Sequence, residues 1–196
     1  MSIANYLTFF RLAISPIFLL IYLMHDFLGI SRISLPYVLL VLLTVSQLTD
    51  LFDGYITRKY NQVTELGKVL DPMADSITNI SVFLTYTMDP VRLPLPLVFI
   101  FLYRDSVIST LRTLCAMKGF TLAAQKSGKI KAWFQAISAY IVLFLMIPES
   151  LGYISDTTLY IASTFVVSIA AFYSLYTGIE YICKYWHFII AKKPAQ

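Results

Sequence analysis

The chain has 196 residues, of which 58% are hydrophobic and only 13% are charged. A soluble domain is nearer half apolar and a quarter charged, so this composition excludes an ordinary soluble protein. It indicates a single polytopic membrane domain over residues 1–196. The formal net charge of +4 fits contact with anionic lipid headgroups. Because the basic residues form no continuous surface, we expect no nucleic-acid partner.

Six stretches are apolar enough to cross a bilayer as helices, which takes roughly 20 mostly apolar residues each. In chain order they are residues 8–24, 35–57, 71–88, 93–117, 132–147 and 157–181. The sequence therefore predicts an all-α membrane protein with six transmembrane helices.

Lysine and arginine gather at one end of these predicted helices. Cytoplasmic connections of membrane proteins carry an excess of both residues, so the basic ends predict orientation. We expect both termini and the even-numbered connections to be cytoplasmic. The residues concerned are Arg11, Arg58, Lys59, Lys68, Lys118, Lys126, Lys129, Lys131, Lys184, Lys192 and Lys193.

Four aspartates lie close to the predicted connection between the second and third helices. Asp50 and Asp53 are three residues apart and therefore lie about 60° apart on one helix face. Asp71 and Asp75 are four residues apart, again on one face. We expect the two helices to be antiparallel neighbours, with the two pairs at the same depth and facing each other.

Carboxylates inside a membrane are costly, by about 2.5 kcal/mol or more each at the helix centre. Four of one sign require a cation, and oxygen ligands select hard cations such as Mg²⁺, Mn²⁺ or Ca²⁺. Two metals would fit sites that clamp a displaced phosphate. A structural alternative exists for Asp71, which precedes Pro72 and suits a helix N-cap. That alternative does not account for the other three aspartates.

Two glycines and an arginine lie within the same segment. For Gly54 or Gly67 taken alone, close helix packing is the favoured explanation, and the approach of a phosphate to the backbone is the functional alternative. Arg58 follows Gly54 by about one turn and has two interpretations. It would pair with a phosphate or a carboxylate, or it would anchor the cytoplasmic side.

The spacing of these residues resembles the signature of the CDP-alcohol phosphotransferases, D-x2-D-G-x2-A-R-x8-G-x3-D-x3-D. Thr57 stands where that family usually has alanine. The opening Asn5-x2-Thr8-x2-Arg11 and the stretch from Arg104 to Lys131 are similar to the phosphatidylglycerophosphate synthase branch of the family. In this chain the signature reads Asp50-x2-Asp53-Gly54-x2-Thr57-Arg58-x8-Gly67-x3-Asp71-x3-Asp75.

The resemblance implies six helices around a cytoplasm-facing polar cavity, usually in a homodimer. It implies two divalent metals, Mg²⁺ or Mn²⁺, which bind the pyrophosphate of a CDP-linked lipid, and Asp75 as general base. The implied metal ligands are Asp50, Asp53, Asp71 and Asp75. We assign the CDP-lipid to Asn5, Thr8, Gly54, Thr57, Arg58 and Gly67.

The fourth predicted helix adds cations beside the carboxylates. Arg104 falls near mid-membrane, where an arginine is expensive and should face a cavity, and Arg112 lies about 80° around the helix from it. With Lys129 and Lys131 these residues predict a pocket for an acceptor that carries a phosphate, such as glycerol 3-phosphate. The alternatives are an ordinary basic loop for the lysines and an internal salt bridge with Asp105 for Arg104.

The predicted reaction transfers the phosphatidyl group of CDP-diacylglycerol to glycerol 3-phosphate, giving phosphatidylglycerol phosphate and CMP. Within the same family the alternatives are an inositol-phosphate acceptor and a cardiolipin synthase. A membrane prenyltransferase would carry its aspartate motifs on separated helices. A divalent-cation transporter would need carboxylates near mid-membrane with a path to both sides, rather than at one end beside cations.

Overall fold

The computed structural model describes residues 3–59, 65–117 and 126–190, with side chains at 6–52, 73–113, 115 and 126–185. These residues form six helices and contain no strand, which confirms the all-α prediction. The helices are α1 (Ile3–Met24), α2 (Leu35–Lys59), α3 (Glu65–Thr85), α4 (Leu95–Met117), α5 (Lys126–Ser150) and α6 (Asp156–Ile190).

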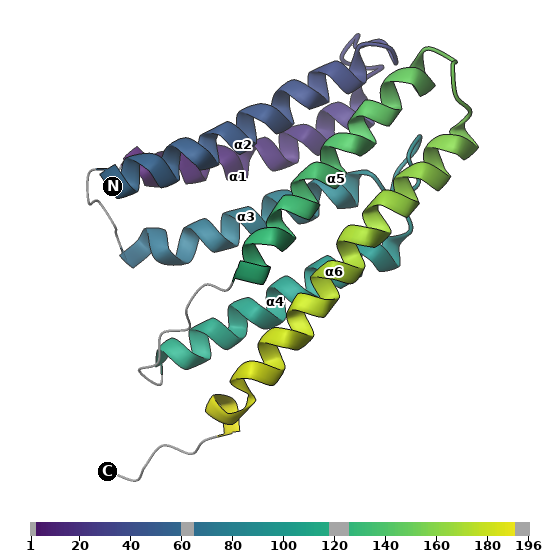
Figure 1. Cartoon of the computed structure of the whole chain (residues 1–196). Helices are drawn as coiled ribbons and strands as arrows, with labels where there is room; N and C mark the ends of the chain where they lie inside the picture. Colours follow the sequence, from purple (N-terminus) through teal and green to yellow (C-terminus); the bar gives the residue numbers. More distant parts are fainter. Residues whose placement is uncertain (1–2, 60–64, 118–125, 191–196) are drawn as a thin grey trace, which may run out of the picture.

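Successive helices run in opposite directions (Figure 1). The start of α1, the end of α2, the start of α3, the end of α4 and the start of α5 therefore lie at one end of the bundle. All of the candidate site residues belong to these helices, and they lie near this end of the bundle or close to the middle of a helix. Antiparallel packing thus gathers residues that are far apart in the sequence.

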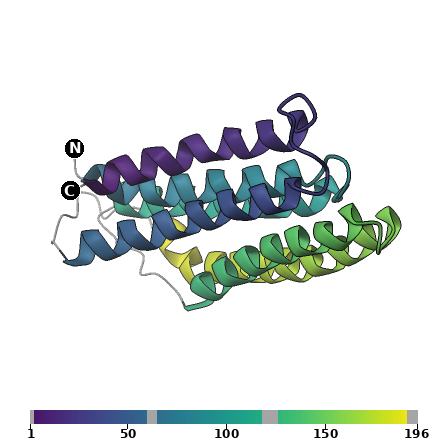
Figure 2. The same ribbon diagram turned by 90° about the horizontal axis from the view of Figure 1, so that it is seen from above.

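The six helices form a closed ring in which each packs against two neighbours. The order around the ring is α2, α1, α3, α4, α6, α5 and back to α2, and α3 also touches α5 across the interior. Figure 2 shows α1 on one side of the bundle and α5 with α6 on the other. Among the described residues α2 and α3 make no direct contact, so the prediction that they are neighbours was wrong. Helix α1 separates them.

The core of the ring consists of large apolar and aromatic side chains. Phe83 of α3 stacks on Phe101 of α4 with ring centroids 4.8 Å apart, and it meets Tyr86 edge-on at 6.2 Å. The hydroxyl of Tyr86, the residue after α3, donates to the carbonyl of Ala139 at 3.1 Å, which ties this end of α3 to α5. Aromatic pairs of this kind contribute about 0.5–1.5 kcal/mol each beyond the area that they bury.

The outer surface is rich in exposed apolar side chains, as expected of helices that face lipid. Trp133, Phe165 and Phe172 are examples. Four of the described helices, α1, α2, α5 and α6, are long and apolar enough to cross a membrane. The protein is therefore an integral membrane protein. The crossing of the membrane by α3 and α4 stays a prediction. These two helices carry charged residues of the candidate site, which lower their hydropathy.

Helix α3 begins at Glu65, six residues before the predicted start. Asp71 therefore lies inside the helix, and the interpretation of Asp71 as an N-cap with Pro72 in the first turn was wrong. A proline inside a helix removes one backbone hydrogen bond, which weakens this part of α3. The early start gives the carboxylates a helical scaffold instead of a loop end.

Helix α5 begins at Lys126, six residues before the predicted start. Gly128, Lys129 and Lys131 are therefore helical, and the alternative of a basic loop was wrong. Residues two apart on a helix differ by about 200° in direction, so Lys129 and Lys131 cannot face the same way. Lys131 is buried and Lys129 is exposed.

Helix α6 packs through small side chains. Ala170, Ala171 and Ser174 are buried, and Gly178 follows them one turn later. Small residues let the backbones of membrane helices approach closely. As a result, α6 can lie against both α4 and α5 over much of its length.

Candidate active site

One guanidinium joins the two halves of the aspartate motif. Nη1 of Arg11, on α1, donates to Oδ1 of Asp50 on α2 and to Oδ1 of Asp75 on α3. The Arg11 side chain is only 3% exposed, whereas the two carboxylates are 43% and 48% exposed. Asp50 and Asp75 therefore meet around one positive charge and keep an open side.

This arrangement explains how carboxylates on two separated helices come together. Because α1 lies between α2 and α3, the side chain of Arg11 reaches both. The site role of Arg11 was missed from the sequence, although a signal was present in Asn5-x2-Thr8-x2-Arg11. Thr8, three residues before Arg11 on α1, is fully buried.

Most of the other motif residues lie where only the backbone is described. Asp53, Gly54, Thr57 and Arg58 lie on α2, and Gly67 and Asp71 lie on α3. Asn5 lies in the first turns of α1. The side chains of all seven lie outside the described residues, so their predicted roles stay predictions. Their helical spacing still places Asp53 one turn from Asp50 and Asp71 one turn from Asp75.

The carboxylates that are described suit a divalent metal. Asp50 and Asp75 offer only oxygen atoms as ligands, and hard cations prefer oxygen. Both carboxylates already bind one positive group, the guanidinium of Arg11. Among the described side chains no group of three or more metal-ligating residues is present, but that set omits Asp53 and Asp71. The ligand atoms of Asp50 and Asp75 are therefore of the chemical type that the predicted metals bind.

A second charged cluster lies on α4 and α5. Nζ of Lys131 donates to both carboxylate oxygens of Asp105, at 2.7 and 2.9 Å. Nη1 of Arg104 donates to Oδ1 of the same carboxylate at 3.0 Å. The side chains of Lys131 and Asp105 are 8% and 6% exposed. The predicted alternative for Arg104, a salt bridge with Asp105, is therefore present, and it includes Lys131.

The remaining predicted cations lie nearer the surface. Arg112 is exposed, and its guanidinium carbon lies 5.8 Å from the centre of the Tyr181 ring on α6. Lys129 is exposed in the first turns of α5. Lys131 and the partly buried Arg104 therefore lie closer to the interior than Arg112 and Lys129, which are exposed.

The carboxylate and cation clusters lie on helices that pack against one another. Helix α3, which carries Asp75, packs against α4 and α5, which carry the cations. A carboxylate site and a cation site side by side can hold a metal-bound diphosphate next to a second, phosphate-bearing substrate.

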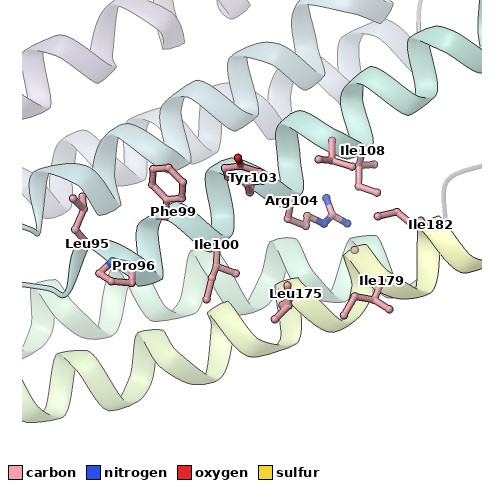
Figure 3. A pocket seen from close by; sticks show the side chains of 12 residues that line it. Leu95, Pro96, Phe99, Ile100, Tyr103, Arg104, Ile108, Leu175, Ile179 and Ile182 are labelled. Carbon is pink, nitrogen blue, oxygen red and sulfur yellow. The ribbon is translucent and has the colours of Figure 1, made fainter.

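An apolar groove of about 600 Å³ runs between α4 and α6 beside the cation cluster. In Figure 3 the side chain of Arg104 extends from α4 toward α6, between Ile108 and Ile179. Nη2 of Arg104 also donates to Oγ1 of Thr177 on α6 at 3.4 Å. Sequence reasoning assigned no site residue to α6, because neither spacing nor motif signals one there.

Comparison with known proteins agrees with the resemblance found in the sequence. The family model for CDP-alcohol phosphatidyltransferase matches residues 1–174. The chain is 32% identical to CDP-diacylglycerol–glycerol-3-phosphate 3-phosphatidyltransferase of Bacillus subtilis (strain 168) over 191 residues, covering 94% of this chain and 95% of that protein.

Two further relatives cover the chain almost as fully. The same-named protein of Rickettsia bellii is 31% identical, over 93% of this chain and 96% of its own length. A probable phosphatidylglycerophosphate synthase of Mycobacterium tuberculosis (strain ATCC 25618 / H37Rv) is 30% identical, over 93% of this chain and 81% of its own. The matched family model and these relatives show that the chain belongs to the CDP-alcohol phosphatidyltransferase family.

Proposed function

We propose that this membrane enzyme transfers the phosphatidyl group of CDP-diacylglycerol to glycerol 3-phosphate and releases CMP. The relatives carry the name of this reaction. The structural observation that carries the proposal is the pair of cations that share Asp105, the buried Lys131 and the partly buried Arg104, on helices that pack against α3, the helix of Asp75. An acceptor without a phosphate would leave these two cations without a role in binding.

The donor lipid is assigned to the carboxylate side. Divalent metal dependence is general in this family, and we assign Mg²⁺ or Mn²⁺, two ions, to the aspartate motif. Bound there, the metals would neutralise charge on the pyrophosphate as the transition state forms. Arg11 holds two of the ligands in place. The proposed ligands are Asp50, Asp53, Asp71 and Asp75, and the proposed CDP-lipid contacts are Asn5, Thr8, Gly54, Thr57, Arg58 and Gly67.

The acceptor is assigned to the cation side. Arg104 presents a planar fork that matches phosphate oxygens, and Lys131 adds a point charge. Asp105 keeps the two cations together and orients them. Arg112 and Lys129, which are exposed, would attract the substrate and complete the pocket.

Asp75 is the proposed general base. It accepts the proton of the acceptor hydroxyl, and that oxygen attacks the phosphorus that carries the diacylglycerol. The bond from this phosphorus to the CMP oxygen breaks, and CMP leaves. Holding both substrates at adjacent clusters converts a two-molecule encounter into a reaction within one complex, which contributes much of the rate.

The setting of the reaction follows from the same proposal. Lipid tails stay in the bilayer while the headgroup enters a polar cavity that faces the cytoplasm. Residues 1–196 form one domain, both termini are cytoplasmic, and the enzyme works as a homodimer in a bacterial inner membrane. Cysteine labelling from each side of the membrane, with single cysteines near each terminus in place of Cys115 and Cys183, tests the orientation.

A substrate panel tests the reaction. Purified protein receives CDP-diacylglycerol and Mg²⁺ with either glycerol 3-phosphate, inositol phosphate or phosphatidylglycerol, and CMP release and lipid products are measured. We expect turnover with glycerol 3-phosphate and its loss in EDTA. Preference for inositol phosphate or phosphatidylglycerol would show that the preferred compound, and not glycerol 3-phosphate, is the acceptor. Absence of CMP release with every acceptor would favour a divalent-cation transporter.

A further inference from the structure

The last helix contacts Arg104 at a glycine. A Cβ atom placed on Gly178 of α6 would lie 3.0 Å from Cγ of Arg104 and 3.9 Å from its Cβ. The first distance is shorter than an ordinary van der Waals contact. The aliphatic part of the Arg104 side chain therefore packs against α6 at Gly178, which has no side chain. Any larger residue at this position would displace Arg104.

The residue before this glycine contacts the head of the same arginine. Oγ1 of Thr177 accepts from Nη2 of Arg104 at 3.4 Å. The hydroxyl proton of Thr177 is donated to the carbonyl of Ser174 at 2.8 Å, so its oxygen is left to act as an acceptor. Thr177 is 1% exposed, which keeps water from competing for this oxygen.

Arg104 is thus held on both sides of its fork. Nη1 donates to Asp105 on its own helix, and Nη2 donates to Thr177 on α6. Gly128 of α5 lies near the same group, and a Cβ there would make only an ordinary van der Waals contact with Nη2, at 4.0 Å. A planar guanidinium recognises phosphate through two parallel hydrogen bonds, so its orientation decides how well it binds.

We propose that Thr177 and Gly178 are positioning residues that aim Arg104 at the phosphate of the acceptor. This inference rests on the proposed function, in which Arg104 binds that phosphate. Neither residue belongs to the aspartate motif, and both lie after residues 1–174, the part matched by the family model. Helix α6 therefore takes part in acceptor recognition through Arg104 without contacting substrate.

The test compares the KM for each substrate in purified variants. In Gly178→Ala the arginine must shift by a fraction of an ångström, and a misplacement of ~1 Å costs on the order of 10²-fold in rate. We expect the KM for glycerol 3-phosphate to rise roughly tenfold, with the KM for CDP-diacylglycerol and the kcat at saturating acceptor within about twofold of the original. Ile161→Val, an exposed position on α6 that does not line the groove beside Arg104, is the matched control.

A second pair of variants separates positioning from packing. Thr177→Val keeps the shape and removes the acceptor oxygen, whereas Thr177→Ser keeps the oxygen. We expect Thr177→Val to raise the KM for glycerol 3-phosphate and Thr177→Ser to keep it near the original value. This pair also decides the matter if Gly178→Ala does not fold.

A double-mutant cycle with Arg104→Ala completes the test. If Gly178 acts through Arg104, adding Gly178→Ala to Arg104→Ala changes the KM for glycerol 3-phosphate no further. The same full rise in both backgrounds would overturn the inference, as would an unchanged KM in both Gly178→Ala and Thr177→Val. If Arg104→Ala itself leaves that KM unchanged, the proposed acceptor site fails instead, so the two failures are distinguishable.

Discussion

Asp105 binds Lys131 through both of its carboxylate oxygens, at 2.7 and 2.9 Å, and binds Arg104 through one of them at 3.0 Å. One buried carboxylate on α4 therefore compensates the buried cation of Lys131 on α5 and the partly buried cation of Arg104. Removing a single partner from a buried ion pair costs about 3–5 kcal/mol, because the other charge is left alone. The order of effects among these three residues follows from this geometry.

Asp105→Asn is expected to destabilise the protein more than Lys131→Met does. The first change leaves the buried Lys131 and the partly buried Arg104 without a counter-charge, whereas the second leaves Asp105 paired with Arg104. We expect a loss of about 3 kcal/mol or more for Asp105→Asn, measured as unfolding in detergent micelles. Equal losses for the two variants would contradict the shared-carboxylate arrangement.

Lys131→Met separates stability from acceptor binding. Under the proposed function it raises the KM for glycerol 3-phosphate at least tenfold, which corresponds to about 1.4 kcal/mol, and spares the KM for CDP-diacylglycerol. Lys126→Met, an exposed lysine at the start of α5, is the control. An equal rise of this KM in Lys126→Met would mean that the effect of Lys131→Met comes from the loss of general positive charge and not from a specific contact.

Arg11→Ala is expected to make stability more dependent on divalent metal. Without Arg11 the carboxylates of Asp50 and Asp75 repel each other, so the variant should lose stability in EDTA and regain more than the original protein does when Mg²⁺ is added. Each kcal/mol corresponds to roughly 2–4 °C in unfolding temperature for a chain of this size. Arg11→Lys, which keeps the charge, should behave like the original, and an equal Mg²⁺ effect in all three proteins would refute this prediction.

Asp75→Asn tests the proposed base. The change is nearly isosteric and removes proton acceptance, so we expect kcat to fall on the order of 10²–10⁴-fold at saturating substrates and Mg²⁺. Asp26→Asn, at the opposite end of the bundle and 93% exposed, should leave kcat unchanged. Normal turnover of Asp75→Asn with metal bound would remove Asp75 from the role of base.

Arg112→Ala tests the outer part of the cation pocket. We expect the KM for glycerol 3-phosphate to rise several-fold, less than for Lys131→Met, because Arg112 is exposed and solvent screens its charge. The KM for CDP-diacylglycerol should stay the same. Arg92→Ala, at the other end of the molecule, is the matched control, and equal effects on both substrates would argue against contact with the acceptor phosphate.

Six helices and a carboxylate motif were predictable because both depend on residues that are close in the sequence. Runs of apolar residues decide where a helix can lie in a bilayer, and a spacing of three or four residues puts Asp50 beside Asp53 and Asp71 beside Asp75. Helix ends were less predictable. Charged segments such as 65–71 and 126–131 are too polar to be read as membrane helix, yet they continue α3 and α5.

What the sequence by itself determined was the membrane setting, the helical composition and the aspartate motif with its family. Only the tertiary structure decided that α1 lies between α2 and α3, so that Arg11 joins Asp50 to Asp75. It also decided that Lys131 faces inward and that Thr177 and Gly178 meet Arg104. The physical reason is that these contacts depend on how each helix is rotated and which helices are neighbours. Both are set by packing of the whole ring, and no local spacing records them.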